Sequence, residues 1–83
     1  MKQVTIYTTM TCPYCYKAKG LLKDLGIAFN EISVDLKPSL RAKMAEKPGK
    51  TSVPQIWFNE DHIGGCDDLY ALHEAGSLME SLS

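Results

Sequence analysis

The chain has 83 residues, of which 45% are hydrophobic and 23% charged, and its formal net charge is −1. These values are ordinary for one soluble domain, which we expect to span residues 1–83, and they leave no basic excess for binding nucleic acid. The first residues lack the long apolar run of a secretory signal, and no segment approaches the ~20 apolar residues that cross a bilayer. We therefore expect a monomeric cytoplasmic protein without a membrane partner, in a compartment that keeps cysteines reduced.

The first half of the chain predicts a strand, a helix and a strand. Residues 2–8 alternate between apolar and polar side chains, which is typical of a strand. Residues 13–25 have apolar side chains three and four positions apart, with Pro13 suited to the first helical position and Gly26 to the stop. Lys17, Lys19 and Lys23 fall mostly outside the apolar stripe, so we expect them to be solvated. Residues 28–34 alternate again and predict the second strand.

The second half predicts a helix, a hairpin and a further helix. Pro38 opens a helix to about Lys47, which Pro48-Gly49 ends. The remaining predicted elements are a strand over 54–58, a turn over 59–61, a short strand over 62–63, a helix from Gly64-Gly65 to Gly76, and a loose turn in 77–83. The order βαβαββα predicts an α/β fold with a four-stranded mixed sheet flanked by three or more helices.

Cys12 and Cys15 are the residues that carry chemistry, because they stand where the first strand gives way to a helix. Unpaired N–H groups and the positive end of the helix dipole at that point favour the thiolate of Cys12, the form that attacks disulfides. Cys15 lies three positions on, on the apolar face, where it should be buried and remain a thiol. We therefore expect Cys12 to attack a disulfide and Cys15 to attack Cys12 in turn, leaving the pair oxidised.

Two other interpretations of the cysteine pair stay open at this point. The pair could be half of a zinc site, for which Cys66 and His62 are the available further donors, or it could be two buried thiols in the core. The strand, Cys-x-x-Cys, helix context favours the redox interpretation over both, and we expect no metal site.

Three segments make the chain resemble a known family along its whole length: Thr11-Cys12-Pro13-Tyr14-Cys15, Ser52-Val53-Pro54, and Gly64-Gly65-Cys66-Asp67-Asp68-Leu69. The chain is similar to the bacterial dithiol glutaredoxins. The resemblance implies a thioredoxin fold, glutathione as cofactor and reductant, and an enzyme that reduces glutathionylated proteins or protein disulfides. Ribonucleotide reductase is a target that the family suggests.

The resemblance also implies a glutathione site. Cys12 would carry the glutathione mixed disulfide, Tyr14 would pack beside the tripeptide, and the Val53 backbone would pair with its cysteinyl unit. Ser52 and Pro54, on either side of Val53, would belong to the same glutathione site, and Pro54 would be cis.

The helix start at Gly65 would hold the γ-glutamyl end of that glutathione. The N–H groups of Cys66 and Asp67 can hold its carboxylate, and the Asp67 side chain can pair with its ammonium. Gly64-Gly65 would let ligand and backbone approach closely. We expect Asp68 to act as a helix-start charge only.

Some positions depart from the family pattern or stay open. Thr9 stands where many glutaredoxins have a Lys, and Lys50 is a candidate to supply that charge. Cys66 is expected to be a buried or half-buried thiol, with oxidation as the alternative. His62 and His73 are expected to be structural or solvated.

Two further functions remain as alternatives. Reduction by thioredoxin reductase is disfavoured by the Gly-Gly-Cys-Asp-Asp segment. Iron–sulfur cluster transfer is disfavoured by Pro13 and Tyr14.

Overall fold

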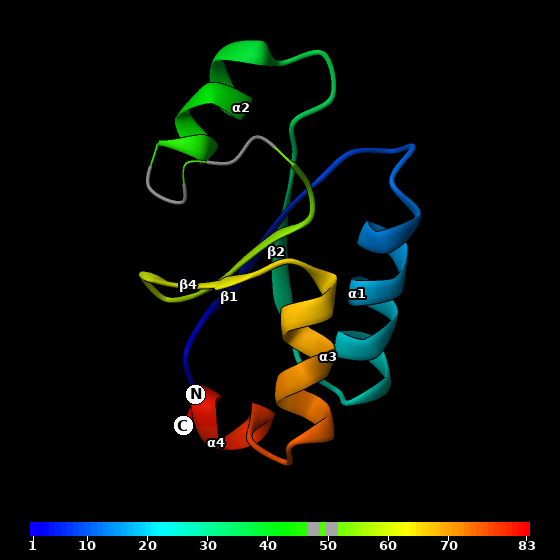
Figure 1. The fold of residues 1–83 in the computed structure, drawn as a ribbon, viewed down its shortest axis with the longest axis vertical. Helices are drawn as coiled ribbons and strands as arrows, with labels where there is room; N and C mark the ends of the chain where they lie inside the picture. The colour runs from blue at the N-terminus through cyan, green and yellow to red at the C-terminus, as the bar shows by residue number, and fades with distance from the viewer. Residues whose placement is uncertain (47–48, 50–51) are drawn as a thin grey trace.

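The computed structural model describes residues 1–46, 49 and 52–83 of the chain. The elements, in chain order, are β1 (Val4–Thr8), α1 (Pro13–Asp24), β2 (Phe29–Ser33), α2 (Pro38–Ala45), β3 (Gln55–Phe58), β4 (Asp61–Gly64), α3 (Cys66–Glu74) and α4 (Leu78–Leu82). Figure 1 shows α1 and α3 next to each other on one side of the sheet, and α2 at the end of the molecule far from both termini. The predicted βαβαββα order is confirmed, and the tail adds a short fourth helix.

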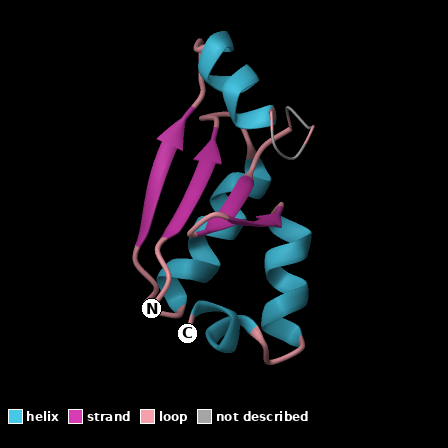
Figure 2. Ribbon diagram, turned by 90° about the vertical axis from the view of Figure 1, so that its left-hand side faces the viewer, coloured by secondary structure: helices cyan, strands magenta, loops and turns pink. Residues whose placement is uncertain are grey.

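The four strands form one mixed sheet in the order β2-β1-β3-β4. β1 runs parallel to β2 and antiparallel to β3, and β3 pairs with β4 as a hairpin. Figure 2 shows the two parallel strands lying side by side. Because β1 is central, its carboxyl end brings the linker to α1 close to the start of β3.

The core lies between one face of this sheet and three helices. The alternation that the sequence predicts puts Val4 and Ile6 of β1 on that face, both at most 1% exposed, while Thr5 and Tyr7 point to the other face and stay half-buried. Buried side chains from all the packed elements share this core: Val4, Ile6, Ala18, Leu21, Leu22, Ile27, Ile56, Phe58, Cys66, Leu69, Leu78 and Leu82. The predicted loose turn of the tail is therefore a helix whose two leucines complete the core.

The predicted boundaries hold to within one or two residues for most elements. Gly26 and Gly76 follow α1 and α3 with φ of 71° and 74°, the left-handed conformation that a glycine stop requires. β4 is longer than the predicted pair 62–63, since it spans Asp61–Gly64. The predicted end of the second helix at Lys47 and Pro48 lies outside the described residues. No helix in the described part of the chain has the length and apolar character needed to cross a membrane.

Candidate active site

The Cys12 side chain occupies the N-cap position of α1. Its backbone is extended, and its Sγ accepts a hydrogen bond from the backbone N–H of Cys15 at 3.2 Å. The first turn of α1 contains no acidic residue, and Pro13 supplies no N–H. The sulfur of Cys12 is therefore the acceptor for a helix terminus whose N–H groups and dipole favour a negative charge.

Cys15 lies behind Cys12 and is fully buried, at 0% exposure. Burial, and next the hydrogen bond with the Cys12 side chain, raise the pKa of the Cys15 thiol to about 12. Cys12, by contrast, is half-buried, and both cysteines are free thiols. The predicted division into an accessible sulfur and a buried sulfur is present in the structure.

The segment before β3 lies against Cys12. The Val53–Pro54 peptide bond is cis, as the resemblance implied. The Cys12 thiol donates to the carbonyl oxygen of Val53 at 3.5 Å. A group joined to the Cys12 sulfur would therefore lie alongside the Val53 backbone.

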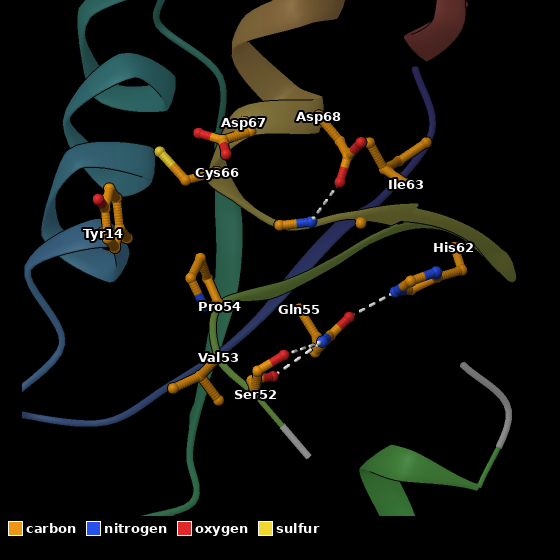
Figure 3. A pocket seen from close by; sticks show the side chains of 12 residues that line it. Tyr14, Ser52, Val53, Pro54, Gln55, His62, Ile63, Cys66, Asp67 and Asp68 are labelled. Atoms are coloured by element: carbon orange, nitrogen blue, oxygen red, sulfur yellow. Dashed lines mark hydrogen bonds between the residues drawn. The ribbon is translucent and has the colours of Figure 1, made fainter. Parts of the chain in front are cut away.

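A cavity of about 340 Å³ opens beside this contact. Its lining comes from the start of α1, the segment before β3, strand β4 and the start of α3 (Figure 3). The seven residues that the resemblance assigned to glutathione all line it: Tyr14, Ser52, Val53, Pro54, Gly65, Cys66 and Asp67. Three segments that are distant in sequence, around residues 14, 52–55 and 62–68, thus surround one cavity.

The two aspartates at the start of α3 are in different environments. The Asp68 carboxylate accepts a hydrogen bond from the Gly65 backbone N–H at 3.0 Å, which is the role of a helix-start charge expected for it (Figure 3). Asp67 is exposed and lines the cavity. Gly64 has φ of +126°, and a Cβ there would lie 2.1 Å from an Asp68 carboxylate oxygen, so this position requires glycine.

Gln55 and His62 also line the cavity, and sequence reasoning did not assign them to it. The Gln55 amide donates to the carbonyl oxygen of Ser52 at 2.8 Å and to its hydroxyl at 3.4 Å. Its oxygen therefore faces Nε2 of His62, at 2.5 Å, and the His62 ring lies 4.8 Å from that of Trp57. This chain of hydrogen bonds ties the segment before β3 to β4 (Figure 3).

The third cysteine, the possible metal ligands and Lys50 are the remaining candidates from the sequence. Cys66 is buried at 4% exposure, as expected, and burial raises the pKa of its thiol. Across the residues that the structure describes, no three His, Cys, Asp or Glu side chains gather as metal ligands would. Lys50, the candidate for a compensating charge, lies outside the described residues.

Comparisons with known proteins agree with this geometry. The Glutaredoxin family model matches residues 4–63. A glutaredoxin of Pseudomonas aeruginosa is 58% identical over 83 residues, covering 100% of this chain and 99% of that protein.

Two solved structures share the fold. The solution structure of a glutaredoxin from Brucella melitensis has a TM-score of 0.87 at 50% identity, covering 99% of this chain and 89% of that one. The crystal structure of a buckwheat glutaredoxin–glutathione complex has a TM-score of 0.90 at 27% identity, covering 98% of this chain and 76% of that one. The predicted thioredoxin fold is confirmed. The chain belongs to the glutaredoxin family, and its activity is that of a glutathione-dependent thiol–disulfide oxidoreductase.

Proposed function

We propose that residues 1–83 act as one domain that reduces glutathione mixed disulfides and protein disulfides in the cytoplasm, with Cys12 as nucleophile and Cys15 as resolving thiol. The observation that carries the proposal is the position of the Cys12 sulfur. It accepts the N–H of Cys15 at the start of α1 and lies 3.5 Å from the carbonyl oxygen of Val53, a residue that lines the cavity. The sulfur thus lies at a helix start, which favours a negative charge, and in a position that a substrate sulfur can approach.

The reaction with a glutathionylated protein needs only Cys12. Its thiolate attacks the glutathione sulfur of the mixed disulfide, a new S–S bond forms, and the electron pair of the broken bond leaves with the protein sulfur as a thiolate. A second glutathione thiolate then attacks the glutathione sulfur held on Cys12. Glutathione disulfide departs, and the Cys12 thiolate is restored.

A protein disulfide requires both cysteines. Cys12 first forms a mixed disulfide with the substrate, and Cys15 then attacks the Cys12 sulfur and releases the second substrate thiolate. Two glutathione molecules reduce the resulting Cys12–Cys15 disulfide. The class of substrate is any accessible protein disulfide, with ribonucleotide reductase as a candidate target.

The glutathione moiety would occupy the cavity as cosubstrate. The Val53 backbone would pair with the cysteinyl unit in extended conformation, and Tyr14, which is 60% exposed, would pack against the tripeptide. The N–H groups at the start of α3 would hold the γ-glutamyl carboxylate, and Asp67 would pair with the ammonium. Ser52 and Pro54 would shape the adjacent wall.

The test compares two cysteine variants in a recycling assay with glutathione, glutathione reductase and a glutathionylated peptide. Cys12→Ser should lose all turnover and remain folded, since serine is a good N-cap residue. Cys15→Ser should keep deglutathionylation and lose reduction of a protein disulfide. Turnover by Cys12→Ser, or equal loss of both reactions in Cys15→Ser, would refute the assignment of roles.

A further inference from the structure

A group of polar side chains links α1 to the parallel strands β1 and β2. Lys19 is one helical turn after Cys15 on α1, so the two side chains lie on the same face. The Lys19 ammonium is 2.8 Å from Glu31 Oε2 of β2. The same oxygen accepts a hydrogen bond at 2.7 Å from the hydroxyl of Thr8, which is 2% exposed at the end of β1.

Lys19 is held in place, which differs from the solvated lysine that the sequence predicted. Its side chain is only 15% exposed. Its ammonium also lies 4.7 Å from the centre of the Tyr16 ring. The spacing of apolar residues along the helix could not predict this ion pair. Its other member, Glu31, is on a strand that comes within reach only through the parallel pairing of β1 with β2. The ammonium is therefore held one helical turn from the buried thiol by a carboxylate whose own side chain is 38% exposed.

The contact with Lys19 favours the ionised form of Glu31. The Lys19 ammonium, followed by the Thr8 hydroxyl, lowers the pKa of Glu31. Burial and the Cys12 side chain raise the Cys15 pKa, whereas the backbone amide of Thr9 and then the positive charge of Lys19 act to lower it. The burial that keeps Cys15 out of solvent thus also makes its ionisation difficult, and a fixed cation one turn away eases it.

We propose that Lys19 is a positioning residue for the resolving step, and that Glu31, oriented by Thr8, sets how much of its positive charge Cys15 experiences. The inference rests on the proposed dithiol function. Cys15 gives up its proton, which ends on the departing substrate sulfur, and its thiolate attacks the Cys12 sulfur of the mixed disulfide. The Cys12–Cys15 bond forms, the bond from Cys12 to the substrate sulfur breaks, and the electron pair leaves on the substrate thiolate. Lys19 stabilises the transient charge on the Cys15 sulfur.

The test measures two turnover rates for each variant of the full chain. One uses a protein disulfide, which needs Cys15, and the other a glutathionylated peptide, which needs only Cys12. The first rate divided by the second isolates the resolving step from folding and from glutathione binding. The variants are Lys19→Met, Lys19→Arg and Glu31→Gln, with Lys23→Met as a control because Lys23 is exposed on the same helix two turns from Cys15.

Lys19→Met should lower the ratio about threefold, the scale of a single solvent-screened charge, and Lys19→Arg should restore most of it. Glu31→Gln should raise the ratio, because the amide still accepts from Thr8 and Lys19 but no longer offsets the ammonium. Lys23→Met should match the original chain. A merely structural role would lower the ratio in both the Lys19→Met and Glu31→Gln variants.

An unchanged ratio in Lys19→Met would overturn the inference, as would a lowered ratio in Glu31→Gln. If the original chain did not deglutathionylate the peptide at all, the proposed function on which the inference rests would be refuted instead. The two failures are therefore distinguishable in one set of assays.

Discussion

The N-termini of α1 and α3 meet at the active site, and they differ in the group that accepts hydrogen bonds from their backbone N–H groups. Each helix begins with backbone N–H groups that have no partner within the helix. At α1 the acceptor is the Cys12 sulfur, and no acidic side chain is in the first turn. At α3 the acceptor is the Asp68 carboxylate, and Asp67 adds a second negative charge.

The difference shows how one local rule gives two functions. A helix start without carboxylates leaves its positive potential to the one group that can become an anion there, which is the nucleophilic sulfur. A helix start with a fixed carboxylate keeps its shape without a ligand and leaves Asp67 free of the capping role. The first arrangement suits chemistry and the second suits recognition of a zwitterionic end group.

The largest expected effect on this comparison is that of Gly64→Ala. A side chain there meets the Asp68 carboxylate and forces φ of +126° on a residue that disfavours it. We expect a loss of about 2 to 4 kcal/mol in the free energy of unfolding, from strain and a displaced cap. Urea denaturation measures it. Gly65→Ala is the matched control, since a Cβ there is 3.5 Å from the Pro54 carbonyl oxygen, an ordinary contact. Gly65 is the N-cap of α3, where alanine is less favourable than glycine, so we expect a smaller loss of about 1 kcal/mol. Equal losses would show that the glycine conformation is not what matters.

Asp67→Asn should separate recognition from stability. We expect KM for a glutathionylated peptide to rise roughly fivefold, because an exposed charge pair with the γ-glutamyl ammonium is lost. The melting temperature should hardly change, since the described hydrogen bonds give the capping role to Asp68. Steady-state kinetics and thermal unfolding of the same sample test both parts. A fall in stability with constant KM would assign Asp67 to the helix instead.

Asp68→Ala should have the reverse pattern. The Gly65 N–H loses its acceptor, and we expect a loss of about 1 kcal/mol in unfolding free energy. Asp68→Asn keeps an acceptor oxygen and should restore most of that stability. Chemical denaturation of the two variants tests this, and identical stabilities for both would mean that charge, not the hydrogen bond, is what Asp68 provides.

The smallest expected effect concerns the carboxylate on the α1 side, Glu31. Its pKa is lowered in the folded protein, so its ionised form stabilises the fold at pH values above the ordinary carboxyl range. That contribution is lost as the pH falls through the lowered value. The melting temperature of Glu31→Gln should therefore lie below that of the original chain at pH 7 and approach it as the pH falls below the ordinary carboxyl range. A gap that is independent of pH would exclude the ion pair as its cause.

The sequence predicted the sheet and the cysteine pair because both depend on local patterns. Alternation in β1 and β2 and the Pro13 and Gly26 signals each act over a few residues. The tail was predicted poorly, since Leu78 and Leu82 have the spacing of one helical face but become core residues only when α4 packs under α3.

The site residues that the sequence missed depend on pairing between strands. His62 reaches Gln55 because β3 and β4 pair with a register shift near Ile56 and Trp57, which periodicity does not reveal. Lys19 likewise meets Glu31 across separate elements. The resemblance supplied the cavity residues, but hydrogen bonds within its wall required the structure.

The most direct test of the account is alkylation of the reduced protein with iodoacetamide at neutral pH, followed by mapping of the label by mass spectrometry. The account predicts rapid labelling of Cys12 alone, because burial raises the pKa of both Cys15 and Cys66. Labelling of Cys15 or Cys66 as fast as Cys12, or a Cys12 that does not react, would contradict it.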